Sequence, residues 1–150
     1  MPTRILVLCT GNSCRSQMAE AFLRQLGGPD IEAYSAGTHP TPVKPFTIQV
    51  LAEVGLDIRD ARSKSMTEFV DHPFDVVVTV CNDAREACPV FPGGGRRVHL
   101  PFDDPTLATG DEAAALGEYR RVRDEIRAWV GEFVAELSGA ARAPEPTARA

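Results

Sequence analysis

The sequence predicts an α/β fold, in which helices alternate with the strands of a parallel sheet. Residues 4–8 and 75–80 are short, largely apolar runs, as expected for strands that are buried on both faces. Elsewhere, apolar residues recur at three- and four-residue spacing, which is typical of helices that pack one face against a sheet. Right-handed crossovers would then bring the carboxyl ends of the strands to one edge, where open α/β sheets bind their ligands.

The elements follow from these patterns in chain order. After the first strand we expect a helix over about residues 15–26, which Gly27 and Gly28 end. The remaining expected strands are 31–36, 75–80 and 97–100, and the remaining helices are 45–54 and 111–137, with a helical turn at 66–69 and a short helix or loop at 82–87. Gly117 marks a point where the last helix could break. Residues 139–150 lack large apolar side chains, so we expect one domain over 1–138 and a disordered tail.

Composition excludes several classes of protein. The chain has 150 residues and a net charge of −5, which disfavours nucleic acid and anionic membranes as partners. No apolar run approaches the length of a membrane-spanning helix, and no secretory segment opens the sequence, so we expect a cytoplasmic protein. Its four cysteines would then be reduced thiols, with any disulfide catalytic, and their spacing does not favour zinc.

Residues 9–16 form the most informative segment, because they place a cysteine at the end of a strand and an arginine at the start of a helix. Small polar residues between them let the loop curl with its N–H groups inward. The helix N-terminus favours both an anion and a thiolate. We therefore predict a nucleophilic Cys9 and an oxyanion site formed by Thr10, Gly11, Asn12, Ser13, Cys14, Arg15 and Ser16. The alternative is a buried cysteine beside an ordinary turn.

Residues 9–20 resemble the low-molecular-weight protein tyrosine phosphatase superfamily, with its cysteine, five residues, arginine and serine, and more particularly its arsenate reductase branch. The resemblance continues through residues 34–37, the cysteines at 81 and 88, and residues 102–105 and 121–126. It covers about residues 4–137. It implies a three-layer sandwich around a four-stranded parallel sheet in the order 2-1-3-4.

A second pair of cysteines distinguishes reductase from phosphatase. Cys81 ends the third expected strand and Cys88 follows seven residues later. A phosphatase needs one nucleophilic cysteine, whereas a reductase must supply two electrons, which two thiols can do by forming a disulfide. With the resemblance, this predicts a relay in which arsenate reacts at Cys9, Cys81 releases arsenite, and Cys88 forms the final disulfide. The resemblance implies thioredoxin as the reductant, and two unrelated cysteines are the alternative.

The resemblance also assigns an acid and a cation site. The family's acid precedes a proline, here Asp104, where it would protonate the leaving oxygen; an ordinary Asp-Pro turn is the alternative. Some reductases of this branch bind potassium behind the loop, and the matching positions are Asn12, Glu20, Ser35 and Lys64. We expect no metal and no tightly bound cofactor, with the Lys64 ammonium in the place of the cation; a solvated surface lysine is the other interpretation.

Two further functions remain open on the sequence. Cys9, Arg15 and Asp104 would also serve a phosphatase acting on phosphotyrosine or small phosphoesters. Residues 106–108 contain no aromatic side chain, which favours a small inorganic oxyanion. An anion-binding or redox-sensing module could use the same loop, although an intact nucleophile and acid argue against it. The favoured hypothesis is a monomeric, thioredoxin-coupled arsenate reductase involved in arsenic resistance.

Overall fold

The computed structural model describes residues 2–81, 91 and 95–139. Its four strands form one parallel sheet in the order β2-β1-β3-β4, which confirms the expected topology. Their bounds are β1 Thr3–Cys9, β2 Ile31–Gly37, β3 Val76–Thr79 and β4 Arg96–His99. β1 lies at the centre, with Leu8 opposite Ala36 on one side and Thr79 on the other. The residues that follow β1 and β3 therefore emerge side by side at one edge.

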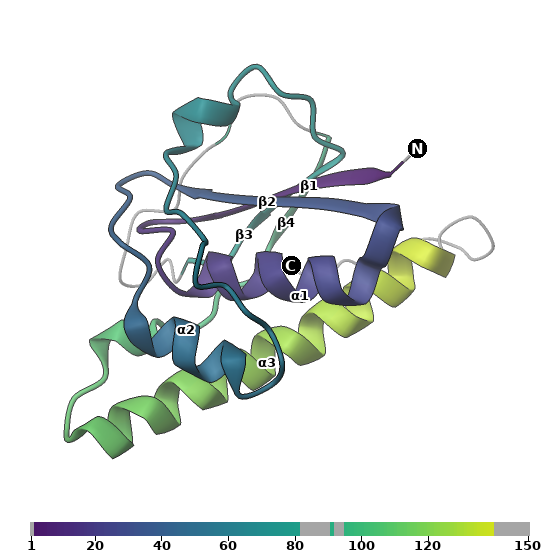
Figure 1. The fold of residues 1–150 in the computed structure, drawn as a ribbon. Coiled ribbons are helices and arrows are strands. Elements are labelled where there is room, and N and C mark those ends of the chain that lie inside the picture. Colours follow the sequence, from purple (N-terminus) through teal and green to yellow (C-terminus); the bar gives the residue numbers. More distant parts are fainter. Residues whose placement is uncertain (1, 82–90, 92–94, 140–150) are drawn as a thin grey trace.

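Three helices cover one face of the sheet, and Figure 1 shows them together below it. Their bounds are α1 Arg15–Gly27, α2 Pro45–Ala52 and α3 Glu112–Gly139. The short 3-10 helices are η1 Gly28–Asp30, η2 Met66–Phe69 and η3 Pro105–Leu107. η2 lies on the opposite face, so the sheet is the middle of three layers (Figure 1).

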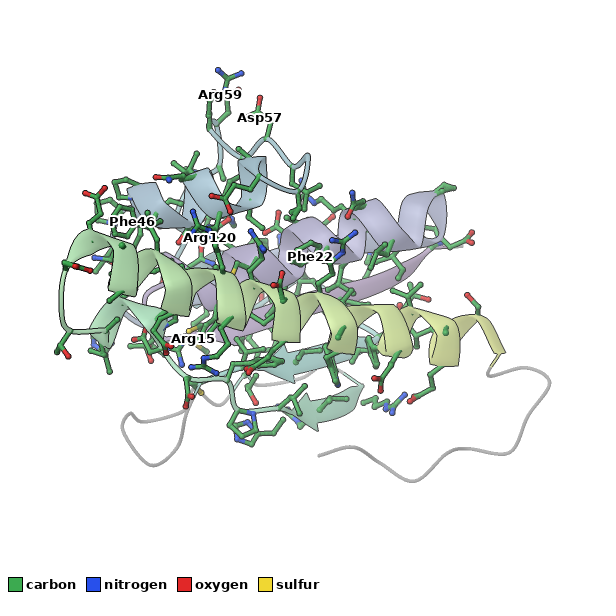
Figure 2. All side chains as sticks on the ribbon, turned by 90° about the horizontal axis from the view of Figure 1, so that it is seen from below. Arg15, Phe22, Phe46, Asp57, Arg59 and Arg120 are labelled. Carbon is green, nitrogen blue, oxygen red and sulfur yellow. The ribbon has the colours of Figure 1, made fainter. Side chains whose placement is uncertain are left out.

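The alternation of side chains along β1 divides the core in two. Ile5 and Val7 pack on the helical side, and Figure 2 shows Phe22 of α1 lying between α1 and α3 there. Leu6 and Leu8 face the other way. Their cluster is completed by Ala36, Phe69, Phe74, Val77 and Phe91. Both faces of the central strand β1 are thus buried from solvent, as its apolar sequence predicts.

The last helix corrects one expectation, because α3 continues through Gly117 without a break. Nothing lies within 4 Å of the position that a Cβ would occupy at Gly117. The helix can carry this glycine because buried residues on both sides of it, including Leu116 and Tyr119, hold the helix against the core. α3 also extends to Gly139, one residue past the expected end of the domain.

Smaller differences concern the ends of elements. α2 ends at Ala52 rather than 54, and Gly55 follows in a left-handed conformation with a φ of 85°. β4 begins and ends one residue earlier than expected. The segment expected at 82–87 and the tail from 140 onward lie outside the described residues.

An arginine pair joins α2 to α3. Arg123 is buried and donates to the carbonyl oxygen of Val50 at 3.0 Å and to Glu53 Oε1 at 2.9 Å. Arg120, labelled in Figure 2, pairs with the same Glu53 at 2.8 Å.

No helix among the described residues is both long enough and apolar enough to span a membrane.

Candidate active site

The loop between β1 and α1 lies at the carboxyl edge of the sheet. β1 ends at Cys9 and α1 begins at Arg15. Cys9 is 3% exposed, so its sulfur lies within the protein rather than on its surface. The helix directs its N-terminal end at the loop, where its dipole favours negative charge.

The carbonyl groups of the loop all point outward. The oxygens of residues 10–13 accept hydrogen bonds of 2.9–3.1 Å from neighbouring segments; the donors are the amides of His39, Thr41 and Lys44 and the side chains of Gln17, Thr47 and Ser63. Because a trans peptide places C=O and the next N–H on opposite sides, the amides of residues 11–14 face the interior of the loop. The loop therefore presents a ring of N–H donors, as an oxyanion site requires.

Asn12 holds the curvature of this loop. Its φ of 51° lies in the left-handed region, which asparagine tolerates better than most residues. Its side-chain amide donates to Ser16 Oγ and Ser35 Oγ, both at 2.9 Å, and its Oδ1 accepts from the backbone N–H of Lys64 at 2.8 Å. The loop also passes close to the end of β2, where a Cβ on Gly37 would overlap the carbonyl oxygen of Thr10.

Arg15 connects the loop to the segment that carries the expected acid. Its Nη1 donates to the carbonyl oxygen of Phe102 at 3.2 Å, and its Nη2 lies 3.5 Å from Asp104 Oδ2. The other oxygen, Asp104 Oδ1, accepts from the backbone N–H of Thr106 at 3.0 Å and from its hydroxyl at 2.6 Å. These bonds fix the carboxyl group with Oδ2 toward Arg15. The neighbouring Asp103 pairs instead with Arg121 on α3.

The environment of Cys14 does not suit a nucleophilic cysteine. Its side chain is buried beside Thr47, and burial raises the pKa of the Cys14 thiol to about 12. It therefore stays protonated at neutral pH and does not act as a second nucleophile.

Cys81 lies where the register predicts, at the edge where Cys9 lies. It lies two residues after the end of β3, is fully buried and is disulfide-bonded, whereas Cys9 and Cys14 are not in a disulfide. The disulfide therefore does not include the expected nucleophile. Cys88, the expected relay residue, lies outside the described residues.

The four residues expected at the cation site form one connected group behind the loop. Ser35 Oγ accepts from Asn12 and donates to Glu20 Oε1 at 2.5 Å, and Lys64 Nζ lies 3.9 Å from the same oxygen. Lys64 is mostly buried and also donates to the carbonyl oxygen of Arg62 at 2.9 Å. Burial lowers the pKa of Lys64, and the charge of Glu20 opposes that shift. Both side chains line a cavity of about 1060 Å³.

Sequence reasoning missed the residues that support the site from a distance. Gln17, Thr47 and Ser63 bind loop carbonyls, and Arg121 binds Asp103. Only Thr106 carries a local signal, because an Asx turn commonly follows an aspartate before proline. His99 on β4 pairs with Thr79 Oγ1 on the neighbouring strand β3 at 2.7 Å. Within the described ranges no three histidine, cysteine or acidic side chains gather as a metal site.

Comparison with known proteins gives a consistent family. Residues 4–143 match the model of the low molecular weight phosphotyrosine protein phosphatase family. An arsenate reductase of Bacillus subtilis is 42% identical over 129 residues, which are 86% of this chain and 93% of that protein. The crystal structure of an arsenate reductase from Archaeoglobus fulgidus is 32% identical, with a TM-score of 0.72 over 88% of this chain and 99% of the other.

A thioredoxin-dependent arsenate reductase of Corynebacterium glutamicum is 27% identical, with a TM-score of 0.69 over 93% of this chain and 63% of that one. The extent of these matches agrees with the shared sheet order and the loop between β1 and α1. The chain therefore belongs to the low molecular weight phosphotyrosine protein phosphatase family, with arsenate reductases among its relatives at about 40% identity.

Proposed function

We propose that this protein reduces arsenate to arsenite through Cys9, Cys81 and Cys88, with a thioredoxin-type dithiol as the final reductant. One observation carries the proposal. An oxyanion loop that starts at Cys9, which is not in a disulfide, shares its edge of the sheet with a second cysteine, Cys81, which is in a disulfide. A hydrolase has no use for that second sulfur, whereas a two-electron reductase requires it.

The first step is attack of the Cys9 thiolate on arsenic. The inward amides of residues 11–14 and the fork of Arg15 hold the arsenate oxygens and stabilise the charge that develops on them. One oxygen leaves as water, and we assign its proton to Asp104, whose Oδ2 lies 3.5 Å from Nη2 of the Arg15 side chain that would hold the oxyanion. The product is a Cys9 thioester of arsenate, in which arsenic is still As(V).

The next two steps are thiolate exchanges. The Cys81 thiolate attacks the Cys9 sulfur, and the electron pair of the S–As bond passes to arsenic, which leaves as arsenite, As(III). A Cys9–Cys81 disulfide remains. Cys88 then attacks Cys81 and frees Cys9 as a thiolate, which leaves a Cys81–Cys88 disulfide that holds the two oxidising equivalents. An external dithiol reduces it, and thioredoxin is our proposal because a relative is thioredoxin-dependent.

The residues beside the acid favour arsenate over phosphotyrosine. Thr106 binds Asp104, Leu107 is 54% exposed, and Ala108 follows, so this rim has no aromatic side chain to stack on a phenyl ring. A phosphatase remains the second candidate, because the family takes its name from that activity and Cys9, Arg15 and Asp104 would serve it equally.

We also propose that the Lys64 ammonium serves where related enzymes hold a monovalent cation, so that no bound cofactor is needed. The support is the position of Lys64 Nζ beside Glu20, which is bonded through Ser35 to Asn12 of the loop. Arg24 Nη2 pairs with Glu20 Oε2 at 2.8 Å, and Lys64 supplies a second positive neighbour on the side of Oε1, the oxygen that is bonded to Ser35. We place the protein in the cytoplasm as a monomer, where its thiols would be returned to the reduced state.

The test is arsenate-dependent NADPH oxidation in the presence of thioredoxin and thioredoxin reductase. Wild type should turn over many times. Cys88→Ser should release about one arsenite per enzyme and then stop as a Cys9–Cys81 disulfide, and Cys9→Ser should release none. Hydrolysis of p-nitrophenyl phosphate is the matched control, because Cys88→Ser should retain it and Cys9→Ser should lose it. Sustained turnover by Cys88→Ser, or activity of wild type on phosphoesters alone, would refute the relay.

A further inference from the structure

We propose that Arg121 on α3 is a positioning residue. It would hold residues 100–104, the loop between β4 and η3 that carries Asp104, in place over the oxyanion site. This inference rests on the role of Asp104 in the proposed function. It concerns an ion-pair network on α3 that no motif of the oxyanion site includes.

Arg121 binds three carboxylates at once. Its Nη2 lies 2.8 Å from Glu118 Oε2 and 3.2 Å from Asp103 Oδ2, and its Nη1 lies 2.9 Å from Glu125 Oε2. Glu118 and Glu125 are one turn before and after Arg121 on the same helix face. Asp103 is the exception, because it belongs to the loop and immediately precedes the expected acid.

The carboxylates of Glu118 and Glu125 lower the entropy cost of the contact between Arg121 and Asp103. An isolated exposed ion pair contributes little, in part because ordering two long side chains costs entropy. Here Glu118 and Glu125 already hold the guanidinium in one orientation, so Asp103 meets a donor that is fixed in advance. Together these three carboxylates and Arg121 form a network of the kind in which surface charges do contribute.

The loop is consequently held from two sides. From inside, Arg15 binds the carbonyl oxygen of Phe102 and faces Asp104. From outside, Arg121 binds Asp103. Phe102 between them is buried in the core. The two residues before Asp104 are therefore both anchored, and they set the position of its backbone, while Thr106 orients its carboxyl group.

Substrate binding makes the outer contact the more important one. Arg15 faces the oxyanion loop, so a bound arsenate competes with Asp104 for its donors. Arg121 does not face that loop, and its contact with Asp103 is independent of the ligand. A hollow of about 180 Å³ lies at this rim, lined by Asp103, Asp104, Leu107, Ala108 and Glu118. Without Arg121, Asp103 and Glu118 would repel one another there, and the loop would move the acid away from the leaving oxygen.

The experiment compares single-turnover arsenate reduction at saturating arsenate. Arg121→Met should slow the step about two- to fivefold, the size expected from losing one surface ion pair in such a network. Asp103→Asn should have the same effect, and the double variant should be no slower than either. Arg120→Met is the matched control, because Arg120 is adjacent to Arg121 in α3 but pairs with Glu53, the residue after α2, and it should leave the rate unchanged.

The decisive readout is the effect of Arg121→Met in an Asp104→Asn background, where it should vanish because there is no acid left to position. An undiminished effect in that background, or a wild-type rate for Arg121→Met, would overturn the proposal. The same variants are also tested on p-nitrophenyl phosphate. If wild type reduces no arsenate, the proposed function fails, and the phosphoester rates then decide the role of Arg121 on their own.

Discussion

Asn12 offers the sharpest test of how the oxyanion loop is built. Replacing Asn12 by Gly removes the bonds that its amide donates to Ser16 and Ser35, and it removes the oxygen that accepts from Gln17 Nε2 and from the partly buried N–H of Lys64. Each net hydrogen bond is worth about 1 kcal/mol, and the unpaired N–H of Lys64, which is only partly buried, should cost about 1 kcal/mol, the lower end of the range for buried donors. Since Ser35 keeps its bond to Glu20, we expect a loss of about 3 kcal/mol in the free energy of unfolding.

Replacing Asn12 by Ala adds a second cost. Alanine has a Cβ but no side-chain bonds to compensate for a φ of 51°. The left-handed conformation then costs roughly 1 kcal/mol more than with glycine. Asn12→Ala should therefore lose about 4 kcal/mol, a large share of the 5–15 kcal/mol, roughly, that stabilises a typical domain.

Urea unfolding measures both variants, provided that the m-value is unchanged. Inorganic phosphate serves as the ligand probe, because it should raise the stability of wild type by occupying the amide ring and should do so less in either variant. Ser65→Ala is the control, since Ser65 caps η2 at the surface and should cost about 1 kcal/mol or less without altering the response to phosphate. A loss below 1 kcal/mol in Asn12→Ala, or equal losses in the two variants, would refute this account of the loop.

Three further predictions concern single groups. Asp104→Asn should slow the arsenate step about 10²–10⁴-fold in single turnover while thiol exchange continues at its normal rate, and an unchanged rate would leave Asp104 as a turn residue. Lys64→Asp should create a dependence of activity and melting temperature on potassium over sodium at equal ionic strength, whereas wild type should show none. Because burial raises the pKa of Cys14 to about 12 from 9.0, the folded state retains a proton that the unfolded chain loses, so stability should fall above about pH 9. Each pH unit should cost up to about 1.4 kcal/mol, and Cys14→Ala should flatten that alkaline slope in pH-dependent unfolding.

The sequence by itself determined those features whose physical cause is local. The apolar run of β1 predicts a strand covered on both faces, and a cysteine, small polar residues and an arginine between strand and helix predict the oxyanion loop. Because all the main-chain donors of that loop lie within a few residues, no distant part of the chain needs to be known. Parallel strands likewise place the ends of β1 and β3 together, so the juxtaposition of Cys9 with Cys81 follows from the topology alone.

Only the tertiary structure decided what holds these residues in place. Asn12 takes its partners from β2 and from the segment at Lys64, more than fifty residues away in the chain. The helix α3 continues through Gly117 because residues near it are buried against the core. Helix propensity, which depends only on the local sequence, does not predict that burial. Arg121 is an ordinary helical arginine in the sequence, and it acquires a role only because the fold brings Asp103 to it. Contacts between residues far apart in the chain leave no periodicity or fixed spacing in the sequence, so only the packed structure shows which residues meet.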